Sequence, residues 1–383
     1  MRCSEWRDAR SEVSLSETRE QSNEERFGDD FARLPPRLSV TSSPLVSVVI
    51  PVYNGEKTIA GAIRSVLAQT YDHFDLTVVN NCSTDRTLAI AEEFAAQDGR
   101  VRVHTNTTFL SVVENHNMAF SCISADAKYA KILGADDWFF PPCIAELVRV
   151  AEEHPTVGMV TSYVLDGTHV GWDGLPYPST FMSGRDVCRL RLLRRIKVFG
   201  GPSASLIRAD IVRASQPFYN PLNYHGDNEA YLTLLQHHDF GFVHQVLSYN
   251  RMGEDSRTTS YLHRVSSYAA IDMDEVTKFG PVYLTEREYA DRLRQATREY
   301  YRFLANAVFE LRSREFWHYH LRHVPAMGYP VQYGRIALYM ALRVVDVVFN
   351  PKRTIEGAVR RLASMLRGLS RRAAAAPARG AAR

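Results

Sequence analysis

An uncharged run rich in valine and isoleucine, residues 46–52, constrains the fold of this chain more than any other feature. Such a run is typical of a central parallel strand that is buried on both faces. The turn pair Asn54-Gly55 follows it, and residues 56–69 carry apolar side chains at helical spacing. A second strand at 74–79 and a second helix at about 86–97 repeat the pattern. The sequence therefore predicts two successive strand–turn–helix units of an α/β protein.

Two adjacent aspartates, Asp136 and Asp137, end a third apolar run at residues 129–135. We expect this run to be a strand whose C-terminal end presents both carboxylates in the crevice where open α/β sheets bind ligands. Adjacent carboxylates repel each other, and a hard divalent cation that bridges to a diphosphate would relieve the repulsion. A solvated turn that merely ends the strand is the alternative.

Several classes of protein are excluded by simpler features. Neither early strand is followed by a glycine fingerprint, so a dinucleotide-binding dehydrogenase does not fit. The net charge of +3 over 383 residues is too small to indicate a nucleic-acid binder. The five cysteines are scattered without a Cys-x-x-Cys pair, which argues against a disulfide scaffold or a zinc site and favours a reducing cytosol. The N-terminus has no apolar stretch, and we expect no signal peptide.

Taken together, these segments resemble glycosyltransferase family 2, the inverting nucleotide-sugar enzymes with a GT-A fold. That family has a strand followed by Pro-x-Tyr-Asn, then an acidic or amide pair before a Ser-Thr-Asp helix start, and later an Asp-Asp metal motif. Residues 51–54, 80–85 and 136–137 match these motifs in order, and the likeness covers about residues 45–259. It implies a Rossmann-like, mostly parallel sheet flanked by helices, with a helical C-terminal extension.

The resemblance also implies an activity and its partners. The expected enzyme is a metal-dependent hexosyl- or deoxyhexosyltransferase that uses Mg²⁺ or Mn²⁺. Its donor would be a nucleotide-diphosphate sugar and its acceptor a glycan or a polyprenyl-linked glycan, in bacterial surface polysaccharide synthesis. A non-catalytic nucleotide-sugar-binding scaffold protein is the alternative, because the chain departs from the family pattern at three positions. These are Asn81, Gly134, where the family often has an additional acid two residues before Asp136, and Gly253, where the family often has a histidine.

By the same resemblance, specific residues receive roles at the donor. Asn81 stands where family members use an aspartate to accept a hydrogen bond from a uracil N–H, and an uncharged amide would accept more weakly. Asp137 is the expected metal ligand, with Asp136 facing the ribose or a metal-bound water. The remaining residues expected to contact the donor are Pro51, Tyr53, Asn54 and Asn117.

Inversion requires one base on the face opposite the leaving group. Asp227 matches the family's acid at the head of a helix, and Glu229 lies two residues later. An acid at that position is also a helix cap stabilised by the helix dipole, which is the structural alternative for Asp227.

Composition divides the chain into four segments. We expect a disordered extension at 1–43, the GT-A domain at 44–262, a helical region at 263–350 and a basic tail at 351–383. The tail holds nine Lys or Arg and one Glu, so it predicts contact with an anionic membrane surface, with an ordinary helical packing domain as the alternative. The protein is therefore expected in the cytoplasm, peripheral to the inner face of the plasma membrane, with no nucleic acid among its partners. His318, His320 and His323 are expected to be packing or surface residues rather than a metal site.

Overall fold

This computed structural model describes residues 43–223, 225–251, 261–262, 264–326 and 328–349. The chain divides into two compact units, residues 1–253 and 254–383, and each is described by itself. The division falls nine residues before the boundary at 262 that composition predicted. The expected N-terminal extension, apart from its last residue, and the basic tail lie outside the described residues.

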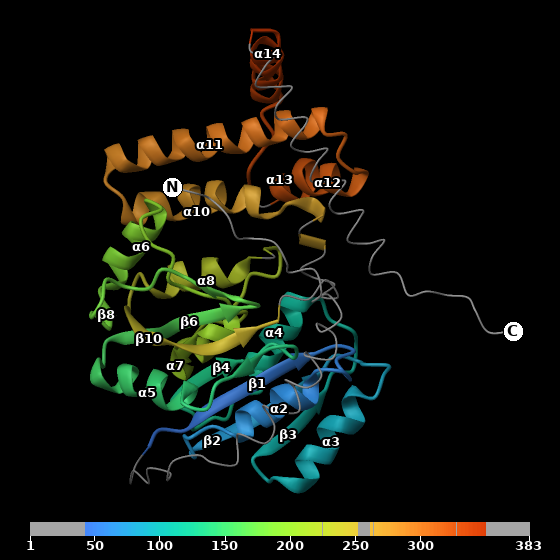
Figure 1. Ribbon diagram of the computed structural model, residues 1–383, viewed down its shortest axis with the longest axis vertical. Coiled ribbons are helices and arrows are strands. Elements are labelled where there is room, and N and C mark those ends of the chain that lie inside the picture. Colours follow the sequence, from blue (N-terminus) through green and yellow to red (C-terminus); the bar gives the residue numbers. More distant parts are fainter. Residues whose placement is uncertain (1–42, 224, 252–260, 263, 327, 350–383) are drawn as a thin grey trace, which may run out of the picture. The chain divides into compact units, whose positions relative to one another are not determined.

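The first unit is built on one mixed sheet with helices on both sides (Figure 1). The main strand order is β3-β2-β1-β4-β9-β6-β10-β5. Strands β1, β2, β3 and β4 are parallel to one another, while β9 runs antiparallel to both of its neighbours, β4 and β6. Because β6 reverses direction again and β10 is parallel to β6, the C-terminal ends of β1, β2, β4, β6 and β10 lie at the same edge of the sheet.

The strands are β1 (Val46–Val52), β2 (Phe74–Asn80), β3 (Val101–Thr105), β4 (Tyr129–Ile132), β5 (Trp138–Phe139), β6 (Val157–Asp166), β7 (His169–Gly171), β8 (Phe181–Met182), β9 (Leu206–Arg208) and β10 (Asp239–Asn250). The helices of this unit are α2 (Ile59–Leu67), α3 (Thr87–Gln97), α4 (Val112–Ser121), α5 (Cys143–Glu153), α6 (Gly184–Leu192), α7 (Ala209–Ala214) and α8 (Gly226–Leu234), with a short 3₁₀ turn η1 (Pro202–Ala204).

Strand β1 is the centre of the core, as its uncharged sequence predicted. All seven of its residues are buried. Val46, Val48 and Ile50 join the apolar faces of α2, α3 and α5 in one cluster, and α4 and α7 pack together elsewhere against the sheet. Pro51 lies within the strand, and β1 continues to Val52. The resulting doubly covered sheet confirms the predicted α/β fold class.

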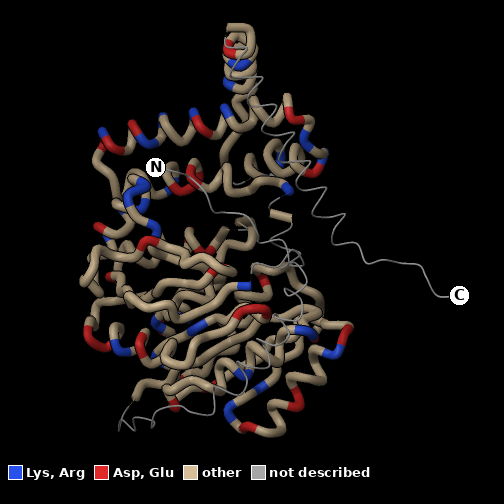
Figure 2. Tube along the Cα trace, viewed as in Figure 1, with Lys and Arg blue, Asp and Glu red and all other residues tan. Residues whose placement is uncertain are grey.

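The second unit is helical. It contains α10 (Tyr268–Tyr283), α11 (Glu286–Phe309), α12 (Arg314–His318), η2 (Tyr319–His323), α13 (Val324–Ala326) and α14 (Tyr333–Phe349). Charges of both signs alternate along the outer side of α11 (Figure 2), and its other side packs on α10 and on one end of α14. Within the described part of this unit, no helix is long and apolar enough to cross a membrane.

His320 is a packing residue, as expected. It is fully buried, its Nδ1 lies 3.0 Å from the Tyr300 hydroxyl, and its Nε2 lies 2.8 Å from the Val265 carbonyl oxygen. Burial lowers its pKa to about 4. The described residues include no group of three His, Cys, Asp or Glu that could hold a metal ion, here or in the first unit.

Candidate active site

The predicted site residues Tyr53, Asn54, Asn81, Asp136 and Asp137 lie at the sheet edge where β1, β2, β4, β6 and β10 end. Tyr53 and Asn54 follow β1, Asn81 follows β2, and Asp136 and Asp137 are four and five residues beyond the end of β4. Asp166 is the last residue of β6, and η1 lies at this edge because the strand after it, β9, runs in the opposite direction. This is the edge at which open α/β sheets bind ligands.

Asp137 is held in one orientation by two hydrogen bonds. The Ser203 hydroxyl donates to its Oδ2 at 2.6 Å, and the backbone N–H of Arg251 donates to its Oδ1 at 3.1 Å. The same Ser203 oxygen accepts from the backbone N–H of Gly134 at 3.0 Å. Residues from β4, η1 and the end of β10 therefore meet at one carboxylate.

The environment of Asp137 disfavours its negative charge. The pKa of Asp137 is raised to about 7. Burial is the main cause, the nearby carboxylates of Asp136 and Asp166 add to it, and the hydrogen bond from Ser203 opposes it. No hydrogen bond from the described residues reaches the carboxylate of Asp136, which leaves its oxygens available. A half-buried site that gathers like charges is the environment in which a divalent cation lowers the free energy most.

The donor set fits a hard cation held partly by substrate. Two carboxylates cannot fill the octahedral shell of Mg²⁺, but that ion is usually held by one or two carboxylates together with phosphate oxygens and water. The family's additional acid has no counterpart here, since Gly134 stands in its place. A Cβ on Gly134 would lie 2.6 Å from Asp137 Oδ2. The absence of a side chain at Gly134 thus allows Asp137 to fold back toward Ser203.

Asn81 does not present a free amide to a nucleobase. It is 3% exposed, and its Oδ1 accepts from Asn106 Nδ2 at 3.0 Å and from the Leu110 backbone N–H at 2.9 Å. Its Nδ2 donates to the Leu110 carbonyl at 2.8 Å. Both acceptor sites of the oxygen are thus used within the protein, and this amide holds the 106–110 loop.

Three further residues expected to contact the donor are occupied in a similar way. Asn117 clamps the backbone of Tyr219 through both amide atoms, at 2.7 and 2.8 Å, and therefore does not point freely toward a diphosphate. Asn54 has a left-handed backbone (φ 52°) and its Oδ1 accepts from the Thr84 N–H at 2.8 Å. Pro51 is buried inside β1. Asn54 and Asn117 therefore hold neighbouring backbone segments in place.

Tyr53 directly follows β1 and has an aromatic neighbour that sequence reasoning missed. Tyr53 is 38% exposed and Phe109 is 62% exposed, and their rings meet edge to face with centroids 4.8 Å apart. Phe109 belongs to the loop that Asn81 anchors through Leu110. Exposed aromatic rings next to a strand end suit stacking on a planar base.

Asp227 is the second residue of α8, at the helix head that the sequence predicted. Burial raises its pKa, opposed by the backbone N–H of Asn228 and by the positive charge of Arg191. Glu229, the alternative base, accepts hydrogen bonds from Asn220 (3.3 Å) and Asn223 (2.8 Å). Glu229 therefore braces the 220–223 loop, which leaves Asp227 as the stronger candidate for a base.

Two of the residues that organise this site were not singled out from sequence, Ser203 and Lys131. Ser203 lies in the short turn η1 after Gly200 and Gly201, and a serine there carries no distinguishing signal. Lys131 did carry one, because it is a charged residue in the middle of an apolar strand. The polar segment after β10, with Gly253 and Arg257, lies outside the described residues.

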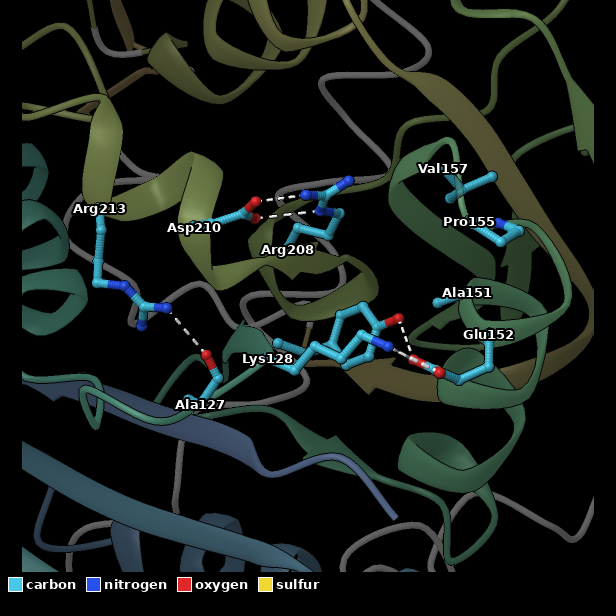
Figure 3. Close-up of a pocket in the computed structure, with 10 residues that line it drawn as sticks. Ala127, Lys128, Ala151, Glu152, Pro155, Val157, Arg208, Asp210 and Arg213 are labelled. Carbon is cyan, nitrogen blue, oxygen red and sulfur yellow. Dashed lines mark hydrogen bonds and ion pairs between the residues drawn. The ribbon is translucent and has the colours of Figure 1, made fainter. Parts of the chain in front are cut away.

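A pocket of about 430 Å³ lies at the opposite edge of the sheet, near the first residues of β4 and β6 (Figure 3). Its charged side chains face their own partners. Lys128 Nζ lies 2.6 Å from Glu152, and Arg208 pairs with Asp210. The pocket is remote from the strand ends that carry Asp136 and Asp137, and it contributes nothing to the candidate site.

Comparison with known proteins agrees with this geometry. Residues 47–215 match the family model described as Glycosyl transferase family 2. A Haemophilus influenzae protein described as an uncharacterized glycosyltransferase is 34% identical over 121 residues, which cover 32% of this chain and 37% of that protein. The Bacillus subtilis protein TuaG, whose name provisionally assigns it to teichuronic acid biosynthesis as a glycosyltransferase, is 30% identical over 128 residues, or 33% of this chain and 50% of TuaG. The chain thus spans less than two thirds of either relative.

Among solved structures, S. aureus TarS residues 1–349 in complex with UDP-GlcNAc has a TM-score of 0.54 to this chain at 17% identity. The match covers 82% of this chain and 91% of the TarS fragment. At this identity the likeness concerns the fold alone, and it confirms the predicted GT-A fold.

Proposed function

We propose that this chain, whose residues 47–215 form a glycosyl transferase family 2 domain, moves a sugar from a nucleotide-diphosphate sugar to a glycan or polyprenyl-linked acceptor. One observation carries the proposal. Asp136 and Asp137 lie at the ligand-binding edge of the sheet, and Asp137 is buried enough for its pKa to rise to about 7. A carboxylate pair of this kind suits a cation that arrives with a diphosphate.

The cation in this proposal is Mg²⁺ or Mn²⁺, since oxygen ligands favour hard metals. Asp137 would ligate it, and Asp136 would face the ribose or a metal-bound water. When bound, such an ion offsets the charge that develops on the departing diphosphate. Ser203 and the Arg251 N–H keep the Asp137 carboxylate oriented before the donor arrives.

We assign the base to Asp227, and with it an inverting mechanism. One carboxylate that accepts the proton of the acceptor hydroxyl is sufficient for a single displacement at the anomeric carbon. Its raised pKa makes Asp227 a better proton acceptor than an ordinary aspartate, provided that it is ionised at the working pH. The dipole of α8 and the charge of Arg191 favour that ionised form.

The nucleobase in this proposal stacks beside Tyr53, with Phe109 as a second wall, rather than pairing with Asn81. The donor sugar is a hexose or deoxyhexose. Membership in the family and the provisional role in the name TuaG support a place in bacterial surface polysaccharide synthesis.

We also propose that the second unit binds the anionic inner face of the plasma membrane. In α14 only Ile336 is buried, while the exposed apolar residues are Leu338, Leu342, Val344, Val345, Val347, Val348 and Phe349. The nine cations of residues 351–383 follow directly in the sequence. Apolar burial and attraction to anionic lipid would act together at such a surface.

The test is a panel of UDP-, GDP- and dTDP-sugars assayed for hydrolysis with Mn²⁺, with Mg²⁺ and with chelator. The proposal predicts cation-dependent release of nucleoside diphosphate from at least one donor, and loss of that release in Asp137→Asn. Donor-induced thermal stabilisation without hydrolysis or transfer would instead favour the non-catalytic scaffold.

A further inference from the structure

Lys131 is a fully buried lysine in the middle of β4. It pairs in register with Val48 of the central strand, and none of its side chain is exposed. Its Nζ donates to the carbonyl oxygens of Ser203 at 2.9 Å and Ser205 at 3.3 Å, and lies 4.4 Å from the centre of the Phe139 ring. Burial lowers its pKa, and the thiol of Cys143 opposes that effect electrostatically; within the described residues no carboxylate forms an ion pair with it.

A lysine in this position is unfavourable for folding alone. A buried ammonium loses its hydration, and here carbonyl oxygens and an aromatic face replace water without a compensating negative charge. An apolar residue would fill the same strand position without that loss. A residue that breaks the local pattern of a buried strand is expected where function requires it.

The segment that Lys131 holds, residues 203–205, connects the two parts of the candidate site. On one side, the Ser203 hydroxyl donates to Asp137 at 2.6 Å. On the other, the Ser205 hydroxyl lies 3.0 Å from the hydroxyl of Tyr231, which is fully buried on α8, four residues after Asp227. The charge of Asp227 reaches Tyr231 and raises its pKa after the larger effect of burial.

We propose that Lys131 is a positioning residue that fixes the 203–205 turn and thereby sets the metal-binding carboxylate and the base helix relative to each other. Two hydrogen bonds from one ammonium to carbonyls two residues apart define the path of the turn. Ser203 then orients Asp137, and Ser205 orients α8 through Tyr231. The inference rests on the proposed function and adds to it a residue that contacts neither donor nor acceptor.

The test replaces Lys131 by methionine, which fills a similar volume without the charge. We expect kcat to fall on the order of 10- to 100-fold, because a misplacement of about 1 Å in a catalytic group has effects of that size. The apparent affinity for Mn²⁺ in the presence of UDP, measured by electron paramagnetic resonance, should also fall, while the thermal midpoint does not fall below that of the control, because methionine avoids the burial of an ammonium. The control is Lys128→Met, which removes the lysine three residues earlier, at the opposite edge of the sheet (Figure 3).

Ser205→Ala separates the contact of the 203–205 turn with Tyr231 on α8 from its contact with Asp137. It leaves Lys131 and Ser203 in place and removes the contact with Tyr231, together with the 3.1 Å bond from the Ser205 hydroxyl to the Pro202 carbonyl within the same turn. It should therefore lower kcat without changing Mn²⁺ binding. If Lys131→Met does not fold, Lys131→Gln, which keeps one donor group, replaces it. Both kcat and Mn²⁺ affinity should then fall below the wild-type values, by less than the loss expected for methionine.

The outcomes distinguish this inference from the proposed function. If the wild type hydrolyses a sugar nucleotide and Lys131→Met matches Lys128→Met in both kcat and Mn²⁺ affinity, Lys131 has no positioning role. The same conclusion follows if activity falls only in proportion to folded protein. If the wild type neither hydrolyses any donor of the panel nor binds Mn²⁺ with UDP, the proposed function itself is wrong.

Discussion

Asp137→Asn should stabilise the metal-free protein, and the stabilisation should grow as the pH rises. In the folded protein the pKa of Asp137 is about 7, mainly because of burial, whereas the unperturbed value is 3.8. For a carboxyl whose pKa is raised by folding, the favourable contribution is present below the unfolded pKa. It is lost as the pH rises through the folded pKa. The wild type therefore loses stability between about pH 4 and pH 7 through this group, and the asparagine variant does not.

The size of the effect follows from the two pKa values. A shift from 3.8 to about 7 corresponds to about 4 kcal/mol when both states are fully ionised, at 1.36 kcal/mol for each pH unit. At pH 5 the unfolded chain is already ionised, so part of that difference is present there. Because the side chain retains some contact with solvent, we expect the variant-minus-wild-type difference to increase by roughly 2–3 kcal/mol from pH 5 to pH 8.

Urea unfolding of both proteins at pH 5 and pH 8, in chelator and then in Mn²⁺, measures this difference. The loss of the bonds from Ser203 and Arg251 affects the variant at every pH, so the change with pH isolates the charge. Folding lowers the pKa of His225 and His320 to about 4, so these histidines also make stability depend on pH in this range, because they titrate there in the unfolded chain. Their contribution cancels because both proteins contain them. Saturating Mn²⁺ should favour the wild type and remove the pH dependence of the difference. A difference that does not change between pH 5 and pH 8 in chelator would refute the view that the apo site stores unfavourable negative charge.

Three other substitutions or truncations test the remaining assignments. Asp227→Asn should leave donor binding nearly unchanged and lower sugar transfer by a factor on the order of 10² to 10⁴. The same pattern in Glu229→Gln, and not in Asp227→Asn, would show that Glu229 is the base and that the assignment to Asp227 is wrong. Asn81→Asp, which restores the family's acid, should not tighten UDP binding in calorimetry and should cost about 1–3 kcal/mol, since its second oxygen would face the Leu110 carbonyl without a donor; tighter binding would show that residue 81 reaches the base. Removal of residues 351–383 should release the protein from anionic vesicles in a flotation assay, more so at raised salt, with donor hydrolysis intact; full-length protein that ignores such vesicles at low salt would make a soluble acceptor the better hypothesis.

The strand ends could be predicted from the sequence because they depend on local pattern. The uncharged run at 46–52, the apolar run before Asp136 and the acidic head of α8 each report burial or capping within a few residues. The parallel arrangement of the strands then brings these ends to one edge. Which carboxylate would be held, and by what, could not be predicted, because Ser203 and Arg251 reach Asp137 from 66 and 114 residues away in the chain.

The hydrogen-bond partners of the asparagines could not be predicted for a related reason. An amide after a strand end can serve a ligand or the backbone equally well, and sequence does not record which partner it finds. In this chain the partners are the Leu110 backbone for Asn81 and the Tyr219 backbone for Asn117. Both residues therefore hold loops rather than facing a ligand.

The departures from the family pattern are easier to understand as one rearrangement than as separate losses. Where an acid would stand, Gly134 leaves room for Asp137 to turn back onto Ser203, and the Gly134 N–H donates to the same hydroxyl. That geometry requires the turn at 203–205 to lie close to β4, and Lys131 reaches from β4 to two of the turn's carbonyls. A glycine at 134, a serine at 203 and a lysine at 131 thus support one another. Restoring the acid alone, as in Gly134→Asp, would push a side chain against Asp137 Oδ2 and disrupt the arrangement.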